Sequence, residues 1–432
     1  MKIAFLVTSS GGSFYCSNCY RDMLYFRAVK MAKDVTATAI PLYLPPEKAY
    51  IESGFDTNVF FGAISLYIRE KIHFLEQMPS FMDKILDAPP LLKLAAKRAG
   101  TTRSEGMEDM TLSMIDGNHS TREKEVERLV RYMIANGKPD VIHLSNALII
   151  GLAKQIKQLM DVRIVCSLQN EDDWVNDMAE PYQSTAWKMM GSESEYVDAF
   201  VSPSRYYKDF VTGKTGIPAE KIHVVPSGID IAAAPVSNKK STDPAIGYFS
   251  RVNYHNGFDK LADAFIGLKK SEEFKNLTLH VCGGFTGDDK PFIAEQIQKI
   301  KTNGFKSSVR IYPEFQGDSK QEFFNAIDLL SVPVRKYDGY GLYILEANAA
   351  GIPVVQPATG AFPEIIRKTN GGILYEPDTV EELIKNLVSL LKDKKKSLLL
   401  GNSGRETVVA EMTLEKMSEG LNSVYRSLLP GQ

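Results

Sequence analysis

The sequence predicts an α/β protein with two doubly wound parallel sheets, each covered by helices on both faces. Short β-rich runs alternate with amphipathic stretches of helical length along most of the chain, which is the βαβ pattern of buried parallel sheets. The alternation stops at a polar, proline-ended stretch near residues 230–243 and then restarts. A length of 432 residues suits two large domains better than a single core.

The strand-like runs follow one another in a regular order. The first half carries KIAFLV, VTATAIPLY, DVIHLS, RIVCSL, AFVSPS and KIHVVPSG, and the second half carries AIGYFS, LTLHVCGG, VRIYPEF, LLSVPVR, PVVQPA and GILY. Thr413 stands at an N-cap position before the final amphipathic run, which predicts a closing helix. We therefore expect a first domain over 1–235, a second over 236–412 and a closing helix over 413–432.

One segment, residues 44–118, interrupts the strand pattern of the first domain. It has helical spacing, several methionines and proline stops, so we expect a helical insertion. Its run PPLLKLAAKRAG is basic and amphipathic. Such a helix usually packs on the body of its domain, and peripheral contact with a membrane or an acceptor groove is the alternative.

Composition limits the class of protein. A formal net charge of -2 gives no electrostatic reason to expect nucleic acid as a partner. No run approaches the length of a membrane span, and the first apolar run is too short for a signal peptide, so we expect a cytoplasmic protein, with the inner face of the membrane as the alternative. Four cysteines are too few for a disulfide scaffold, and Cys166 and Cys282 lie in strand patterns that predict core packing.

Ligands of doubly wound sheets bind at the carboxyl ends of the strands. Gly11 and Gly12 follow the first strand and would let the backbone approach an anion such as a diphosphate. A tight turn without a ligand explains the two glycines equally well.

A stronger signal is the stretch SVPVRKYDGYGLYILEANAAGIPVVQPATGAFPEII, residues 331–366. It resembles the nucleotide-sugar site of the retaining glycosyltransferases of the GT-B fold, family-4 type. The resemblance implies two Rossmann-like domains that face one another across a cleft, with the donor in the second. The matching residues are Glu346, Ala347, Ala349, Gly351, Pro353, Val354, Gly360 and Glu364.

The resemblance implies a role for each donor-side residue. Glu346 corresponds to the glutamate that holds the ribose hydroxyls, and a carboxylate can accept from both hydroxyls of a diol. Asp338 replaces the glutamate that faces the sugar. Arg251 corresponds to the arginine of the diphosphate clamp, and Asn256 stands where the family has a lysine. The remaining donor-side residues are Gly339, Tyr340, Gly341 and Leu342.

Because Asn256 stands at the position of the lysine, two alternatives are open for the diphosphate clamp. Another cation, Arg335 or Lys336, takes over its charge, or the donor binds more weakly.

The first domain departs further from the family pattern. His143 matches a family histidine, whereas Ser145 and Gln169 replace others. The resemblance implies front-face transfer in which the leaving phosphate takes the acceptor proton, so the protein mainly positions groups and stabilises charge. We expect Asp338, Arg251 and Gln169 to be the catalytic residues, and the acceptor side to comprise Asn18, Arg21, Asp22, His143, Ser145, Gln169, Asn170 and Glu171.

Cys16 and Cys19 have the spacing of a metal knuckle or a redox pair. Zinc would need further ligands such as His73 and His119, so we expect the two cysteines to shape the turn instead, with zinc and redox chemistry as alternatives.

The resemblance implies a retaining, metal-independent hexosyltransferase without a cofactor. Its partners would be a nucleotide sugar and a hydroxyl-bearing acceptor, namely a saccharide, a glycolipid precursor or a surface polysaccharide. The alternative is a catalytically degenerate nucleotide-sugar-binding protein with a regulatory or scaffolding role. The pattern does not determine the oligomeric state.

Overall fold

A computed structural model describes residues 1–8, 14–43, 45–46, 48–61, 104–118, 122–237, 243–336 and 338–429. The chain forms two compact units. The first comprises Met1–Gly11, Asn18–Pro226 and Met417–Gln432, and the second comprises Gly12–Ser17 and Ser227–Lys416. The chain therefore passes into the second unit after Pro226, and the expected boundary at residue 235 lies inside that unit.

The first unit contains a six-stranded parallel sheet with the strand order β2-β1-β3-β4-β5-β6. All six strands predicted for the first half of the sequence are present. They are β1 (Lys2–Val7), β2 (Thr36–Pro41), β3 (Val141–Leu144), β4 (Arg163–Ser167), β5 (Ala199–Ser202) and β6 (Ile222–Val224).

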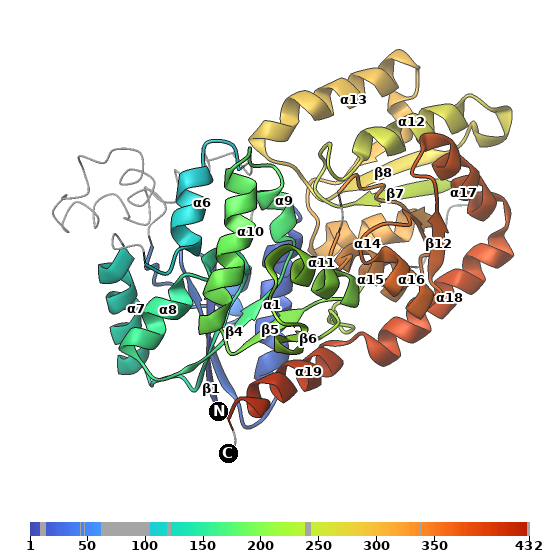
Figure 1. Cartoon of the computed structure of the whole chain (residues 1–432). Coiled ribbons are helices and arrows are strands. Elements are labelled where there is room, and N and C mark those ends of the chain that lie inside the picture. The colour runs from blue at the N-terminus through green and yellow to red at the C-terminus, as the bar shows by residue number, and fades with distance from the viewer. Residues whose placement is uncertain are drawn as a thin grey trace. The chain divides into compact units, whose positions relative to one another are not determined.

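Helices cover both faces of this sheet because alternate residues of each buried strand point to opposite sides. Leu6, Ile142 and Ile164 pack in one core with residues of α7, α8, α10 and α11. Figure 1 shows these helices beside the strands of the first unit. The helices are α1 (Ser17–Lys30), α2 (Lys48–Glu52), α6 (Glu108–Ile115), α7 (Glu123–Ala135), α8 (Leu152–Leu159), α9 (Glu171–Val175), α10 (Tyr182–Glu193), α11 (Arg205–Thr215) and α19 (Leu414–Ser427), with short 3₁₀ turns η3 (Ala147–Ile149), η4 (Ser194–Tyr196) and η5 (Ala219–Lys221).

The opposite face of the first sheet packs on α1 and α19. The Phe5 ring meets Phe26 of α1 at a centroid distance of 5.9 Å, and His143 meets Tyr425 of α19 at 5.7 Å. Helix α19 lies within the segment 413–432 that was expected to close the chain, and its residues from Met417 belong to the first unit. The expected insertion over 44–118 lies largely outside the described residues, which include α2 and α6 at its two ends.

The second unit contains a second six-stranded parallel sheet, with the order β12-β11-β10-β7-β8-β9. The six strands predicted for the second half of the sequence are confirmed. They are β7 (Ala245–Phe249), β8 (Thr278–Cys282), β9 (Val309–Ile311), β10 (Leu329–Leu330), β11 (Val354–Pro357) and β12 (Gly372–Tyr375).

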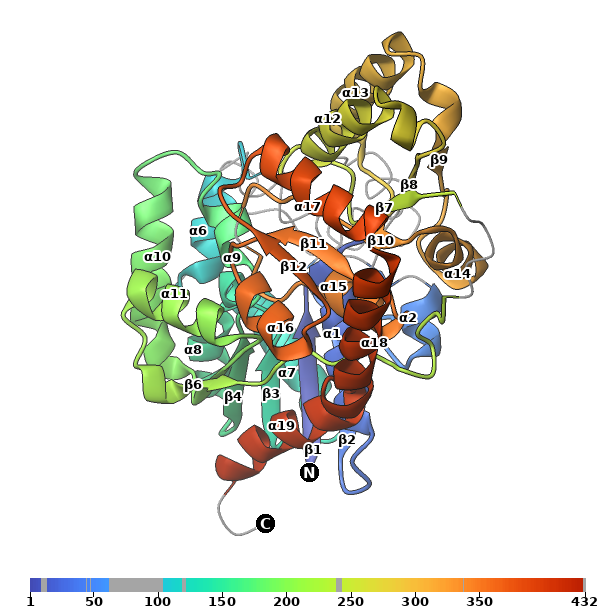
Figure 2. The same cartoon turned by 90° about the vertical axis from the view of Figure 1, so that its right-hand side faces the viewer.

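Figure 2 shows α12, α13 and α17 above the strands of this sheet and α14, α15, α16 and α18 below them. Both faces are covered, which explains why its strands read as continuous apolar runs. The helices are α12 (Phe258–Lys269), α13 (Lys290–Thr302), α14 (Gly317–Ala326), α15 (Leu342–Ala349), α16 (Phe362–Thr369), α17 (Val380–Lys392) and α18 (Lys394–Glu411), with 3₁₀ turns η6 (Glu272–Phe274), η7 (Gly287–Asp289) and η8 (Lys306–Ser308).

Candidate functional site

The second sheet has its topological switch point between β7 and β10, where the strand order reverses. The loops that leave the carboxyl ends of two such strands diverge, and a ligand can bind between them. Arg251 follows β7 and Asp338 follows β10. The motifs that the sequence singled out in this domain therefore meet at one end of the sheet.

Glu346 is the central carboxylate at this end of the sheet. It lies in α15 and is only 2% exposed. Lys320 of α14 forms an ion pair with its Oε1 atom, and the Tyr15 hydroxyl donates to its Oε2 atom at 2.9 Å. A buried carboxylate needs such partners because its desolvation is costly. The sequence analysis did not find Lys320 or this role of Tyr15.

Asp338 holds the turn that leads into α15. Its Oδ1 atom accepts hydrogen bonds from the backbone N–H groups of Tyr340 at 3.0 Å and Gly341 at 2.9 Å. Gly341 has a φ of 50° and directly precedes the helix. At Gly360, a Cβ atom would lie 2.5 Å from the carbonyl oxygen of Asp338. The loops after β10 and β11 thus approach too closely for a side chain at residue 360.

Arg251 is paired within its own unit. Its Nε and Nη2 atoms bind the two carboxylate oxygens of Asp289 at 2.8 and 3.0 Å, and Nη2 also donates to the Thr286 hydroxyl at 3.0 Å. Such a fork is a strong and directional ion pair. No sequence motif pointed to Asp289, which is the last residue of the run GDD at 287–289.

Asn256 supports the loop after β7. Its side-chain amide donates to the carbonyl oxygen of Arg251 at 2.9 Å and to the Ser250 hydroxyl at 3.1 Å. Arg335, one of the cations considered as a substitute for the missing lysine, is bound bidentately by Asp259 at 2.6 and 2.5 Å. Asn256 therefore shapes the loop, and the charge of Arg335 is balanced by a carboxylate.

In the first unit, several predicted acceptor-side residues come together at the carboxyl ends of β3 and β4. The Gln169 side-chain amide donates to Asp22 Oδ1 at 3.0 Å and to the carbonyl oxygen of Ser145. Arg21 Nη1 donates to the carbonyl oxygen of Leu168 at 2.7 Å. Among the residues that the structure describes, the buried Gln169 Oε1 atom has no hydrogen-bond partner.

The residues after β4 form a tightly held turn. Asn170 has a φ of 54°, a left-handed conformation that is uncommon outside glycine. The Glu171 carboxylate accepts from the backbone N–H groups of Ala147 and Gln169, each at 2.9 Å, and from the Tyr207 hydroxyl at 2.7 Å. Glu171 thus fixes the loops after β3 and β4. Asn18 lies half-buried in the first turn of α1.

His143 does not lie on an acceptor surface. It is fully buried, and its ring nitrogens contact the Tyr425 hydroxyl at 2.6 Å and the Ser167 hydroxyl at 2.7 Å. Burial lowers the pKa of His143 to about 3. The acceptor-side prediction for His143 is therefore corrected, because its position in β3 turns the side chain towards the core under α1 and α19.

Other predictions concern the N-terminal loop and metal binding. Gly11 and Gly12 lie outside the described residues, as do His73 and His119. Cys16 and Cys19 are disulfide-bonded, and Cys166 and Cys282 are buried free thiols. Within the described ranges, no group of three or more histidine, cysteine, aspartate or glutamate side chains is arranged to hold a metal ion.

In the described part of the chain, no helix is both long and apolar enough to cross a bilayer.

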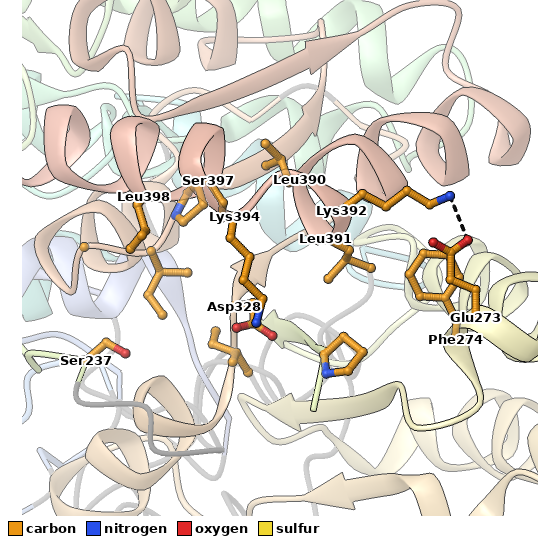
Figure 3. A pocket seen from close by; sticks show the side chains of 15 residues that line it. Ser237, Glu273, Phe274, Asp328, Leu390, Leu391, Lys392, Lys394, Ser397 and Leu398 are labelled. Atoms are coloured by element: carbon orange, nitrogen blue, oxygen red, sulfur yellow. Dashed lines mark ion pairs between the residues drawn. The ribbon is translucent and has the colours of Figure 1, made fainter. Parts of the chain in front are cut away.

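A cavity of about 400 Å³ lies at the opposite end of the second sheet, near Pro244, Asp328 and Pro353, which precede β7, β10 and β11 (Figure 3). Lys392 and Glu273 form an ion pair of 2.7 Å among its lining residues. Because ligands of such sheets bind at the carboxyl ends of the strands, this cavity is separate from the candidate site.

Two family models match the chain. The model described as "Glycosyl transferases group 1" matches residues 231–407, and the model described as "Glycosyltransferase Family 4" matches residues 119–233. Together they span most of the second unit and the strands β3, β4, β5 and β6 of the first sheet.

Two curated relatives are about a quarter identical to the chain over the residues that align. The lipopolysaccharide core biosynthesis mannosyltransferase LpsB of Rhizobium meliloti is 26% identical over 43% of this chain and 53% of its own length. A D-inositol 3-phosphate glycosyltransferase of Salinispora arenicola is 27% identical over 48% of this chain and 49% of its own length. The chain thus spans about half the length of these two relatives.

Solved structures resemble the fold over the whole chain. Sucrose-phosphate synthase of Thermosynechococcus elongatus has a TM-score of 0.73 at 16% identity and covers 100% of both chains. HepE of Anabaena, solved in complex with UDP and glucose, has a TM-score of 0.71 at 16% identity and covers 99% of this chain and 100% of its own. At this identity the likeness establishes the fold.

The buried Asp22 gives a testable pH dependence. Burial raises the pKa of its carboxyl from 3.8 to about 7. Between these two pKa values, Asp22 keeps its proton in the folded state and has lost it in the unfolded state. The free energy of unfolding therefore falls as the pH rises from about 4 to about 7. We expect the free energy of unfolding of Asp22→Asn to exceed that of wild type by about 1 to 4 kcal/mol at pH 8. At pH 4 the two free energies should be nearly equal.

The measurement is urea denaturation across this pH range, with the exposed Asp161→Asn as the control. If the free energies of unfolding of wild type and Asp22→Asn changed in parallel with pH, the raised pKa of Asp22 would be contradicted.

Proposed function

We propose that this chain is a glycosyltransferase of the GT-B fold that moves a sugar from a nucleotide-sugar donor to a hydroxyl group of an acceptor. One observation carries the donor assignment. The Glu346 carboxylate lies buried at the carboxyl end of the second sheet, beside the glycine turn that begins α15. A carboxylate with two oxygens suits the two ribose hydroxyls of a nucleotide.

The proposed diphosphate site lies around the turn before α15. Gly339 and Gly341 bring the backbone close to a ligand, and the first N–H groups of α15 favour a negative charge. Arg251 is the proposed cation, and a diphosphate would compete for it with Asp289. Asp338 acts in this proposal by holding the turn, since two N–H groups of the turn already bind its carboxylate.

The first unit is the proposed acceptor side. Gln169 is its central residue because its Oε1 atom, buried and without a hydrogen-bond partner in the described residues, can accept from a hydroxyl group. Asp22 and Ser145 hold its amide group in place. In this proposal Gln169 orients the acceptor and does not act as an acid or base.

The proposed acceptor is a saccharide, a glycolipid precursor or a surface polysaccharide. Support comes from the names of relatives, which include a lipopolysaccharide core mannosyltransferase and a GDP-mannose-dependent phosphatidylinositol monomannoside mannosyltransferase of Mycobacterium tuberculosis. A lipid-linked acceptor would bring the protein to the inner face of a membrane from the cytoplasm. The basic run at residues 89–100, outside the described residues, is the proposed contact.

A ligand screen tests the donor assignment. We expect UDP or GDP, or one of their sugar conjugates, to raise the melting temperature by several degrees, because a ligand that binds only the folded state stabilises it. ADP conjugates and free sugars are included for comparison. Absence of a shift with every nucleotide would overturn the donor assignment. Sugar release from the donor that binds then separates a transferase from a protein that only binds nucleotide sugars.

Glu346→Gln tests the ribose role. Loss of the charge should weaken nucleotide binding about 10- to 100-fold, the difference expected for hydrogen bonds to a charged group. Glu382→Gln is the matched control, because Glu382 also pairs with a lysine, Lys385 at 3.1 Å, on the surface of the same unit. Isothermal titration measures the affinity, and circular dichroism checks folding. Equal affinities for Glu346→Gln and Glu382→Gln would exclude the proposed ribose contact.

The proposed chemistry is retaining and needs no metal cofactor. Proton NMR of the fresh product should show the anomeric configuration of the donor, and EDTA should leave the rate unchanged. An inverted product would contradict retention. A rate lost in EDTA and restored by Mg²⁺ or Mn²⁺ would contradict metal independence.

A further inference from the structure

We infer that the Tyr15 hydroxyl and the donor nucleotide compete for Glu346, so that Tyr15 sets the affinity of the donor site. The inference rests on the proposed function of Glu346. It concerns a part of the N-terminal loop, residues 14–17, that packs with the second unit although it lies between two segments of the first.

The backbone of this loop is bound to the end of the second sheet. Phe14 forms an antiparallel bridge with Gly284, and the Tyr15 N–H donates to the carbonyl oxygen of Gly283 at 2.6 Å. Gly283 directly follows β8, and its φ of 132° is a conformation that favours glycine. The loop therefore docks at the same end of the sheet that holds the candidate donor site.

The Tyr15 side chain is buried at this end of the sheet. Its ring lies 4.8 Å from the Phe249 ring and 6.2 Å from the Phe315 ring, and the residue is 4% exposed. Its hydroxyl donates to Glu346 Oε2 at 2.9 Å. Aromatic packing thus fixes the ring, and the ring in turn fixes the hydroxyl on the carboxylate.

Phe14 contacts the second proposed donor residue. The guanidinium of Arg251 lies 5.0 Å from the centre of the Phe14 ring, which is a cation–π distance. Two consecutive aromatic residues thus contact the two charged groups assigned to the ribose and to the diphosphate. This coincidence points to the donor site as the place where the loop acts.

The chemistry of the carboxylate explains the competition. One oxygen of Glu346 already pairs with Lys320, and the other accepts from Tyr15. A ribose hydroxyl is also a donor and can replace the phenol with little change in hydrogen bonding. The nucleotide must, however, first break the hydrogen bond that the fixed phenol makes to the carboxylate. Part of the binding free energy is therefore spent on the exchange, and the observed affinity is lower than the site itself would allow.

Tyr15→Phe tests the inference because it removes the competing hydroxyl and keeps the ring. We expect the variant to bind UDP or GDP about three- to thirtyfold more tightly than wild type, the range expected when one hydrogen bond to a charged group no longer competes. Tyr312→Phe is the matched control, since it removes another buried tyrosine hydroxyl of the same unit, bonded to His280 at 2.9 Å. Both variants are measured by isothermal titration, with circular dichroism as a folding check.

The outcomes separate this inference from the proposed function. Tighter binding by Tyr15→Phe alone supports the inference, including the case in which wild type shows no measurable binding. Equal or weaker binding by Tyr15→Phe, with a wild type that binds, overturns it and leaves the donor site standing. Weaker binding would mean that the phenol helps to hold the nucleotide. No binding by either protein overturns the donor site itself, and the inference with it.

Discussion

The buried carboxylate of Glu346 is the interaction on which the candidate donor site depends. A carboxylate that is 2% exposed needs charge and hydrogen bonds to offset the loss of water. Lys320 provides the charge from α14, and Tyr15 provides a hydrogen bond from a loop near the N-terminus. Because the buried Glu346 carboxylate needs hydrogen-bond donors, it can also accept hydrogen bonds from a ligand, such as the hydroxyl groups of a ribose.

The same principle applies to the other charges at this end of the second sheet. Arg251 is balanced by Asp289, and Arg335 is balanced by Asp259. The cations that would attract a diphosphate are therefore paired with carboxylates, and the positive end of α15, which follows the glycine turn, does not depend on side-chain charge. In this arrangement, binding of a diphosphate is an exchange of partners more than an addition of new ones.

The first unit uses polar groups differently. Its candidate acceptor side is a buried network in which Gln169 links Asp22 to the loop after β3, and Glu171 binds backbone groups of two loops. A network of this kind orients side chains more than it supplies acids or bases. His143, one strand residue away from Leu144, serves the core instead. His143 lies within β3 and Gln169 follows the carboxyl end of β4, so position along the strand decides which polar residue can meet a ligand.

The sequence by itself determined the twelve strands that the structure describes and its last helix, because these depend on local patterns: apolar runs between turn residues and an N-cap. The continuous motif from Asp338 to Glu364 lies within the residues that a glycosyltransferase family model matches. Only the tertiary structure decided the partners of the charged groups. Tyr15 and Glu346 lie 331 positions apart in the sequence, and the pairing of Arg251 with Asp289 joins two loops after different strands. The side-chain direction of His143 and the unit to which α19 belongs also came from packing. Local patterns specify elements, whereas contacts between distant residues depend on how those elements pack in space.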